Sequence, residues 1–120
     1  MSVGMMAERT GERDLGMGKD VPDIETKNNG ARQTAIPYRF DLIDPIAMFE
    51  LAKVVSEGAK KYAPDNWRGL TVEDNLNRVL AHVYAHLAGD ETDDHLEHAL
   101  TRMVFAVAKK HRPDYRGRNA

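Results

Sequence analysis

The sequence predicts an all-α fold, a small helical bundle of three main helices. Apolar residues recur at helical spacing in three successive segments, and capping residues or glycine mark the ends of these segments. No segment alternates apolar and polar residues with the period of two that is typical of a half-buried strand. Because the chain has only 120 residues, its core is small, and we expect oligomerisation into a homodimer or homotetramer to complete the bundle.

The first 31 residues predict a flexible N-terminal segment. They are rich in glycine and charged residues, and such a composition buries too little apolar surface to offset the entropy lost on ordering. Residues 32–43 are more apolar, but Pro37 argues against a regular helix, so we expect an extended arm there. The all-α domain is therefore assigned to residues 32–112, and residues 113–120 are assigned to a basic C-terminal tail.

The first helix is predicted to begin after Asp44 and to end at about Lys61. Asp44 is a favourable N-cap, and proline at the next position is favoured because its missing N–H has no helical partner there. The apolar face of this helix consists of Ala47, Met48, Leu51, Val54, Val55 and Gly58.

The second helix is predicted over residues 71–88 and the third over about 93–111. Asp74 follows Thr71 by three residues, which indicates a variant of the capping box, and Gly89 supplies the stop. The apolar stripes that we expect to face the core are Leu76, Val79, Leu80, Val83 and Leu87 in the second helix and Leu96, Leu100, Met103, Val104 and Val107 in the third.

Composition excludes several classes of site. The chain has no cysteine, so disulfides and cysteine zinc sites are excluded. It has neither an apolar run of about 18 residues nor a signal-peptide pattern, so we expect a cytoplasmic protein without a membrane partner. The net charge of −2 conceals a basic end, because residues 109–118 carry five lysines or arginines and one aspartate. This segment suits either a solubilising tail or a contact with nucleic-acid phosphates.

Polar residues flank the apolar stripe of each helix. They are Glu50, Glu57 and Lys61 on the first helix, Asn75, Arg78, His82 and His86 on the second, and His95, His98 and Arg102 on the third. Any one of them alone is most simply an ordinary helix-edge residue. Their coincidence on three helices is the arrangement from which helical bundles build metal and ligand sites.

Motif spacing narrows the chemistry. His82 and His86 have the spacing of a zinc-protease helix, but Val83 stands where the general-base glutamate belongs. The inverted zinc motif is one residue too short at His95 and His98, and the sequence has no phosphate-binding glycine loop and no His-Asp dipeptide. The remaining candidates are carboxylates, whose oxygens favour Mg²⁺ or Mn²⁺.

The segment EGAKKYAPDNWRG, residues 57–69, is the most informative part of the chain. It ends the first helix and places two lysines, Tyr62, Asn66 and the only tryptophan, Trp67, in one short loop. Loops held by a rigid scaffold frequently carry functional residues. An acidic helix edge followed by a basic loop suits a metal-bound phosphate.

Several short segments carry a family resemblance. They are RFDLI at 39–43, GAKKY at 58–62, Asn66-Trp67, Asn77-Arg78, His82, Gly89-Asp90 and HLEHA at 95–99. Over about residues 28–110 the chain resembles the phage dATP/dGTP diphosphohydrolase (MazZ-like) family, which is related to the MazG-like all-α nucleoside triphosphate pyrophosphohydrolases. The resemblance implies a phage enzyme in the host cytoplasm that cleaves a purine deoxynucleoside triphosphate into the monophosphate and pyrophosphate, with Mg²⁺ or Mn²⁺ as cofactor.

The resemblance, together with the charge of a triphosphate, implies individual roles. The implied metal ligands are Glu50, Glu57, Asp90 and Asp94, and the implied catalytic residues are Glu50, Glu57 and Asp94. Glu91, Asp93 and Glu97 compete with Asp90 and Asp94, so the second carboxylate set stays open. The implied substrate-binding residues are Lys61 and Arg78 for the phosphates, Tyr62, Asn66 and Trp67 for the base, and His82 and His95 for phosphate oxygens or for the carboxylates.

Two alternatives remain. One is a non-catalytic helical phage module that binds nucleic acid through its basic C-terminal tail, whereas the enzyme is expected to have no nucleic-acid partner. The other is a pyrophosphohydrolase of a different nucleotide. Metal-dependent thermal stabilisation favours an enzyme, and salt-sensitive binding to DNA favours the module.

Overall fold

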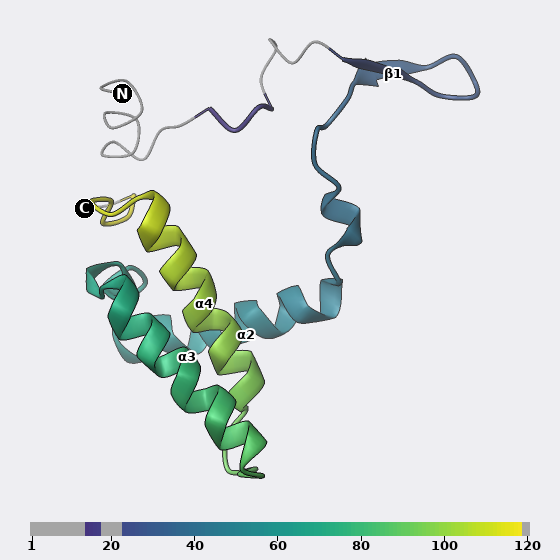
Figure 1. The fold of residues 1–120 in the computed structure, drawn as a ribbon. Coiled ribbons are helices and arrows are strands. Elements are labelled where there is room, and N and C mark those ends of the chain that lie inside the picture. Colours follow the sequence, from purple (N-terminus) through teal and green to yellow (C-terminus); the bar gives the residue numbers. More distant parts are fainter. Residues whose placement is uncertain (1–13, 18–22, 119–120) are drawn as a thin grey trace.

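A computed structural model describes residues 14–17 and 23–118 of the chain. Helices dominate the described part, which confirms the predicted all-α class, and a short hairpin precedes them (Figure 1). The elements are β1 (Ile24–Thr26), β2 (Arg32–Thr34), the 3₁₀ helix η1 (Phe40–Leu42), α2 (Pro45–Lys61), the 3₁₀ helix η2 (Asn66–Gly69), α3 (Val72–Leu87) and α4 (His95–His111). The predictions for residues 1–13, 18–22 and 119–120 lie outside the described residues.

The ends of the helices follow the local signals in the sequence. The Asp44 carboxylate accepts a hydrogen bond from a backbone N–H in the first turn of α2, and Pro45 occupies the first helical position. At the start of α3, the Thr71 hydroxyl accepts from the Asp74 N–H and the Asp74 carboxylate accepts from the Thr71 N–H, which completes the predicted capping box. Gly89 follows α3 with a φ of 85°, a left-handed conformation that suits glycine.

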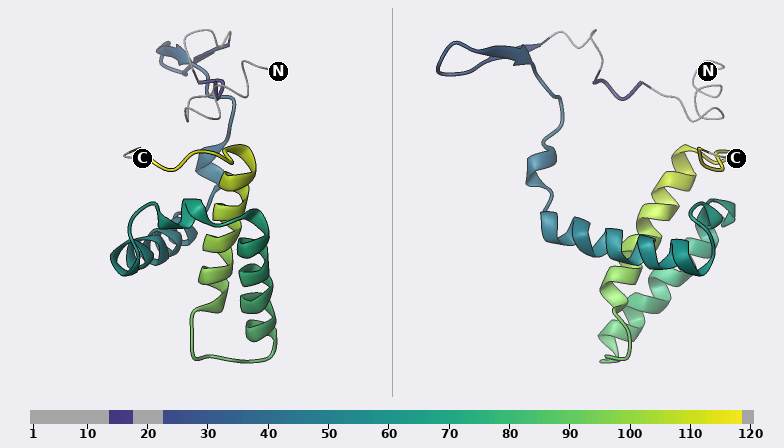
Figure 2. Two further views of the ribbon diagram at one scale, coloured as in Figure 1. Left: turned by 90° about the vertical axis from the view of Figure 1, so that its left-hand side faces the viewer. Right: turned by 180° about the vertical axis from the view of Figure 1, so that it is seen from behind.

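α3 and α4 form an antiparallel pair, and α2 crosses this pair and packs chiefly against α4 (Figures 1 and 2). The buried apolar residues are Val79 on α3 and Ala99, Phe105 and Ala106 on α4. Asn75 and Thr101 are also buried, and both are polar. None of the helices within the described ranges is long and apolar enough to cross a membrane.

The apolar stripes are less buried than the sequence predicts. Leu80, Leu87 and Leu96 expose 53%, 72% and 51% of their surface. Leu76, Met103, Val104 and Val107 are exposed as well. The prediction that these residues face inward is therefore wrong for the single chain. The reason is geometric, because each stripe is broader than the surface that two neighbouring helices cover.

The hairpin of β1 and β2 was not predicted by the sequence pattern. The two strands are antiparallel, and Glu25 pairs with Gln33 at the centre. In the turn, the Gly30 N–H donates to the Lys27 carbonyl, and Gly30 has a φ of 89°. The Asn-Gly step within this turn was the available signal. Strands of three residues are too short to display an alternating pattern.

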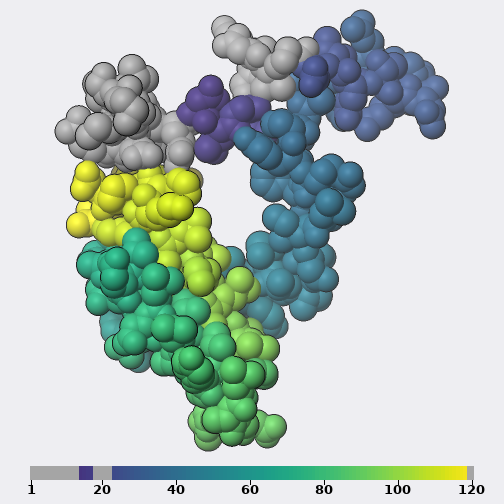
Figure 3. Space-filling model, in the orientation of Figure 1, coloured from purple at the N-terminus to yellow at the C-terminus, as the bar shows by residue number. Residues whose placement is uncertain are grey.

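Residues 23–44 project from the helical body (Figures 2 and 3). Several large apolar side chains on this projection are exposed, among them Tyr38, Phe40 and Leu42. The hairpin packs on no helix in Figures 1 and 2, so the part of the molecule that positions a site begins at α2.

Aromatic stacking and the C-terminal segment hold the loop between α2 and α3. The Trp67 indole stacks on Phe105, with ring centroids 4.1 Å apart and an interplanar angle of 7°. The guanidinium carbon of Arg68 lies 4.3 Å from the indole centroid. The Arg68 carbonyl accepts hydrogen bonds from Lys109 (2.6 Å) and Arg116 (2.9 Å). Lys109 near the end of α4 and Arg116 beyond it thus bind the loop to the C-terminal part of the chain.

Candidate functional site

A cavity of about 770 Å³ lies where the C-terminal half of α2 and the following loop face α3 and α4. Its polar and aromatic lining includes Glu57, Lys61, Tyr62, Asn66, Trp67, Arg78, His98 and Arg102. Val54, Val55 and Leu70 add an apolar part to the wall. Sites for small molecules in proteins have volumes of roughly 300–1,000 Å³ and combine apolar walls with a few placed polar groups. The cavity has both properties.

Three cations line this cavity, and none of them has a carboxylate partner among the described residues. Lys61, Arg78 and Arg102 form no ion pair within 4.0 Å in the described part of the chain. Burial lowers the pKa of Arg102, and the positive charge of Arg78 lowers this pKa further. A guanidinium remains protonated even so, which means that two like charges are held close together. Such an arrangement favours a bound anion.

The buried amide of Asn75 holds Arg102 in place. The Arg102 Nη1 donates to the Asn75 Oδ1 over 3.3 Å, and the Asn75 Nδ2 donates to the Thr71 carbonyl over 2.9 Å. Asn75 is 0% exposed, so both hydrogen bonds are sheltered from water. The start of α3 therefore supports the position of a cation that α4 contributes.

Three acidic side chains line the same cavity, namely Glu57, Glu73 and Asp74. Asp74 is engaged in the capping box, and the hydrogen bond from the Thr71 backbone lowers the pKa of its carboxyl. Glu57 and Glu73 form no ion pair within 4.0 Å among the residues that the structure describes. Two free carboxylates on the wall that carries the cations are oxygen donors suited to a hard divalent ion.

The aromatic and amide residues of the loop also reach the cavity. Tyr62 is 62% exposed, so its ring is available to a ligand. Trp67 is half-buried, and its stack on Phe105 gives it a packing role in the loop. Asn66 is exposed and opens η2. A ligand in the cavity would therefore meet Tyr62 and Asn66 more readily than a face of Trp67.

A cluster of histidines and aspartates lies at the end of α3 and the start of α4. His82 Nδ1 and His95 Nδ1 are 2.9 Å apart, and His95 Nε2 is hydrogen-bonded to Asp90. His98 stacks on His82 with ring centroids 5.2 Å apart, and its Nε2 lies 3.4 Å from Asp93. Burial lowers the pKa of His82, and His98 and His95 lower it further, so the neutral imidazole is favoured. His98 also lines the cavity, so the cluster adjoins it.

The structure thus divides the predicted site residues into two groups. Those that line the cavity are Glu57, Lys61, Tyr62, Asn66, Trp67 and Arg78. Those in and beside the turn between α3 and α4 are His82, Asp90, Asp94 and His95. Glu50 belongs to neither group, because it does not line the cavity and lies on α2, away from the turn between α3 and α4. Its carboxylate is 3.3 Å from the Lys53 ammonium. The roles of all these residues stay predictions, and those of Glu50, Asp90 and Asp94 have no support from the cavity.

The sequence analysis assigned no individual role to Arg102 or His98. Both had been placed on one polar face of the third helix, which was the available signal. Their importance comes from contacts with another helix, Asn75 for Arg102 and His82 for His98, and helical spacing alone does not reveal such contacts.

Comparisons with known proteins agree with the resemblance seen in the sequence. A family model described as "dATP/dGTP diphosphohydrolase, N-terminal" matches residues 27–117. A curated relative, the dATP/dGTP diphosphohydrolase of Salmonella phage PMBT28, is 36% identical over 69 residues. The match covers 53% of this chain and 24% of the relative, so the matched part of the chain spans about a quarter of that protein. No solved structure matches the chain significantly.

Proposed function

The chain belongs to the dATP/dGTP diphosphohydrolase N-terminal family, and from this premise we propose that it acts in the hydrolysis of dATP or dGTP to the monophosphate and pyrophosphate. The name of the phage relative supports the substrate class. The setting would be phage nucleotide metabolism in the host cytoplasm. The observation that carries the proposal is the cavity with three cations that lack a carboxylate partner among the described residues.

The cavity supports this substrate through its charges. A triphosphate carries about four negative charges, and phosphate groups are held by lysine as a point charge and by arginine as a two-pronged donor. Lys61, Arg78 and Arg102 would bind the phosphates, while Tyr62 and Asn66 would contact the base. The volume of about 770 Å³ accommodates a ligand of nucleotide size.

The reaction is a displacement at phosphorus. A water oxygen forms a bond to the α-phosphorus, and the bond from this phosphorus to the α–β bridging oxygen breaks, with its electron pair leaving on pyrophosphate. The water gives up a proton, and we assign Glu57 to accept it because Glu57 is a carboxylate on the cavity wall without a cationic partner among the described residues. The three cations would stabilise the charge that develops on the pyrophosphate.

The residues of the cavity fit a divalent cofactor. Glu57 and Glu73 offer carboxylate oxygens beside the phosphate-binding cations, and such oxygens suit Mg²⁺ or Mn²⁺. When bound, the ion would supply neutralisation of phosphate charge. Glu57 belongs to the predicted ligand set, and Glu73 is added here. Glu50, Asp90 and Asp94 remain predicted ligands that substitution can test.

The decisive experiment incubates the protein with dATP or dGTP and Mg²⁺ or Mn²⁺, and separates the products by anion-exchange chromatography. Monophosphate and pyrophosphate are the expected products. Lys61→Ala is expected to raise KM on the order of tenfold or more, because a hydrogen bond to a charged group contributes about 1.5–3 kcal/mol. Lys60→Ala is the matched control, since Lys60 is exposed and does not line the cavity.

The outcomes separate this proposal from its alternatives. Equal KM values for the two lysine variants would overturn the assignment of the cavity as the phosphate site. Hydrolysis of a different nucleotide would keep the site and replace the substrate. The nucleic-acid module receives less support, because Lys109 and Arg116 of the basic end are used to bind the Arg68 carbonyl. Salt-sensitive binding to DNA without hydrolysis would restore that alternative.

A further inference from the structure

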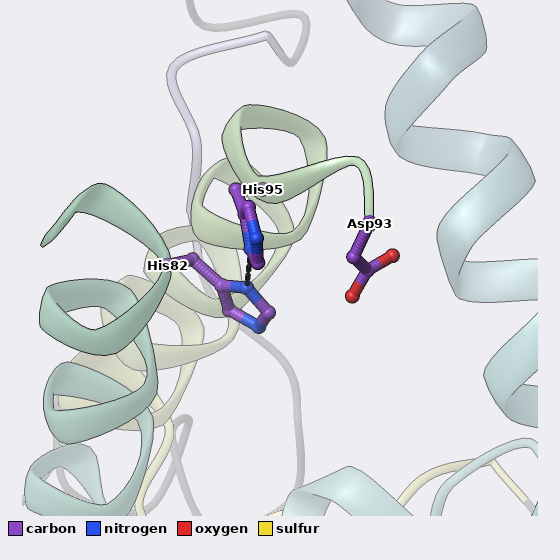
Figure 4. Close-up of side chains that lie close together, drawn as sticks. All are labelled: His82, Asp93 and His95. Carbon is purple, nitrogen blue, oxygen red and sulfur yellow. Dashed lines mark hydrogen bonds between the residues drawn. The ribbon is translucent and has the colours of Figure 1, made fainter. Parts of the chain in front are cut away.

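The histidine–aspartate cluster at the turn between α3 and α4 gathers potential metal ligands. His82 comes from α3, His95 begins α4, and Asp93 lies in the turn before it. Each offers one ligand atom, and these three atoms lie within 4.8 Å of one another. Figure 4 shows the two imidazoles pointing toward each other and Asp93 beside them. Within the described residues, this is the one group of three or more such side chains that comes together in this way.

The orientation of the His95 ring is the strongest sign of a ligand. An ionised carboxylate only accepts hydrogen bonds, so the contact with Asp90 places the proton of a neutral His95 on Nε2 and leaves a lone pair on Nδ1. That lone pair accepts a hydrogen bond from His82 Nδ1, 2.9 Å away, so His82 would carry its proton on Nε2 instead when both Nδ1 atoms bind an ion. Histidines that bind metals typically donate the other ring N–H to a carboxylate or carbonyl, which fixes the ring and raises its basicity. Asp90 supplies this support.

The spacing of the nitrogens fits a shared ion. Two nitrogens that each lie about 2.0–2.1 Å from a tetrahedral zinc ion are roughly 3.3 Å apart. His82 Nδ1 and His95 Nδ1 would need to separate by only a few tenths of an ångström to reach this value. The two imidazole nitrogens therefore lie nearly at the separation that one shared ion would give them.

From this geometry we propose that His82, Asp93 and His95 bind a divalent transition-metal ion, for which Zn²⁺ is the representative. Two imidazoles and one carboxylate are ligands that zinc accepts and that Mg²⁺ rarely uses. The site is separate from the carboxylates of the cavity and does not rest on the proposed hydrolysis. Zinc-motif spacing along the chain missed it, because the two histidines come from different helices.

A bound ion would join the end of α3 to the start of α4. The connecting residues 88–94 form no helix. Three protein ligands leave a fourth tetrahedral position for water. The ion would thus stabilise the folded state according to its concentration relative to its Kd.

The test uses the full chain after treatment with a chelator, in the absence of nucleotide. Isothermal titration with ZnCl₂ is expected to give one site per chain, and Zn²⁺ is expected to raise the melting temperature. Co²⁺ in place of Zn²⁺ is expected to produce the visible absorption bands of a tetrahedral site. His95→Gln and Asp93→Asn should abolish stoichiometric binding, while Asp90→Asn should weaken it about 10–100-fold.

His86→Gln is the matched control, because His86 lies on α3 one turn from His82 but is exposed and outside the cluster. This variant is expected to bind Zn²⁺ as the wild type does. Lys61→Ala should also bind normally, so a failure of the nucleotide proposal leaves this result unaffected. Circular dichroism checks that each variant is folded. The titration of the wild type tests the proposal even if a variant fails to fold. Absence of stoichiometric Zn²⁺ binding by the wild type, or equal loss in His86→Gln and His95→Gln, would overturn the proposal.

Discussion

At the scale of single residues, Asn75 links stability to the candidate site. Its side chain is the largest in the described part of the chain to be fully buried, and its amide contacts both the Thr71 carbonyl and the Arg102 guanidinium. Burial of a polar group is unfavourable unless its hydrogen bonds are made. Asn75 is therefore better suited to holding a neighbouring cation than a leucine of similar size would be.

Asn75→Ala is expected to lower the free energy of unfolding by about 1–3 kcal/mol, because the Thr71 carbonyl and Arg102 each lose a sheltered partner. Urea denaturation monitored by circular dichroism measures this change. Asn77→Ala is the control, since Asn77 is exposed on the same helix and should change stability little. A variant of Asn75 as stable as that of Asn77 would contradict the supporting role.

Glu57→Gln tests the chemistry at the same scale. The change keeps the shape of the side chain and removes its charge, so we expect a folded protein whose kcat falls on the order of 10²-fold, as for loss of one stabilising contact in the transition state. The sequence predicts the same loss for Glu50→Gln, although Glu50 is paired with Lys53 and does not line the cavity. Steady-state hydrolysis of dATP and dGTP by both variants distinguishes the two carboxylates. Full activity in Glu57→Gln would remove Glu57 from the mechanism.

The candidate site could be predicted where its residues share one loop and could not where they meet across helices. Lys61, Tyr62 and Asn66 lie within six residues of one another, so composition of the loop was enough to find them. Arg102 depends on a contact 27 residues away, with Asn75, and periodicity along either helix contains no information about that distance. Whether the predicted carboxylates of α2 line the cavity likewise depends on how α2 crosses the α3–α4 pair.

At the scale of the elements, capping residues determine where helices α2 and α3 begin. Helices α2 and α3 begin at side chains that accept backbone N–H groups, and both starts were predicted because capping is local chemistry. Burial was predicted less well, as the exposed Leu80 and Leu87 show, because it depends on how much surface the neighbouring helices provide. The hairpin was missed because its turn, rather than any periodicity in its strands, defines it.

Thr71→Ala is expected to destabilise the protein by about 0.5–2 kcal/mol, since it removes the hydroxyl that accepts the Asp74 N–H at the start of α3. Thr71→Ser is the matched control, because serine retains an accepting hydroxyl at the same position. Thermal unfolding of the three proteins gives the comparison. If Thr71→Ser loses as much stability as Thr71→Ala, the cap is not the source of the effect.

The other half of the capping box predicts a dependence on pH. The hydrogen bond from the Thr71 backbone N–H lowers the pKa of the Asp74 carboxyl in the folded state. A lowered folded pKa means that the stabilisation is present above the ordinary aspartate pKa and is lost as the pH falls through the folded pKa. The difference in melting temperature between the wild type and Asp74→Asn should therefore shrink as the pH is lowered below about 4. A difference that stays constant down to pH 2 would contradict the role of the charge.

At the scale of the whole molecule, the single chain is open. Its radius of gyration is 18.2 Å. A compact domain of this length is expected at roughly 14 Å. The projecting arm accounts for part of the excess, and the helices themselves leave Leu80, Leu87 and Val107 exposed. Soluble monomers rarely expose large continuous apolar patches. Leu80, Leu87 and Val107 belong to the stripes that the sequence pattern assigns to a core.

Association of copies of the chain follows as a prediction. We expect sedimentation equilibrium at micromolar concentration to give a dimer or tetramer of the 13.5 kDa chain, because the exposed stripes of α3 and α4 would gain about 25 cal/mol for each Å² of apolar surface removed from water. Leu80→Lys is expected to shift the distribution toward monomer, since it places a charge within the exposed stripe. Ala81→Lys introduces the same charge at the next exposed position of α3, away from the leucines, and should leave the distribution unchanged. A wild type that sediments solely as a monomer would show that the stripes stay open in solution, and equal dissociation of both variants would show that charge on α3, rather than loss of the stripe, separates the subunits.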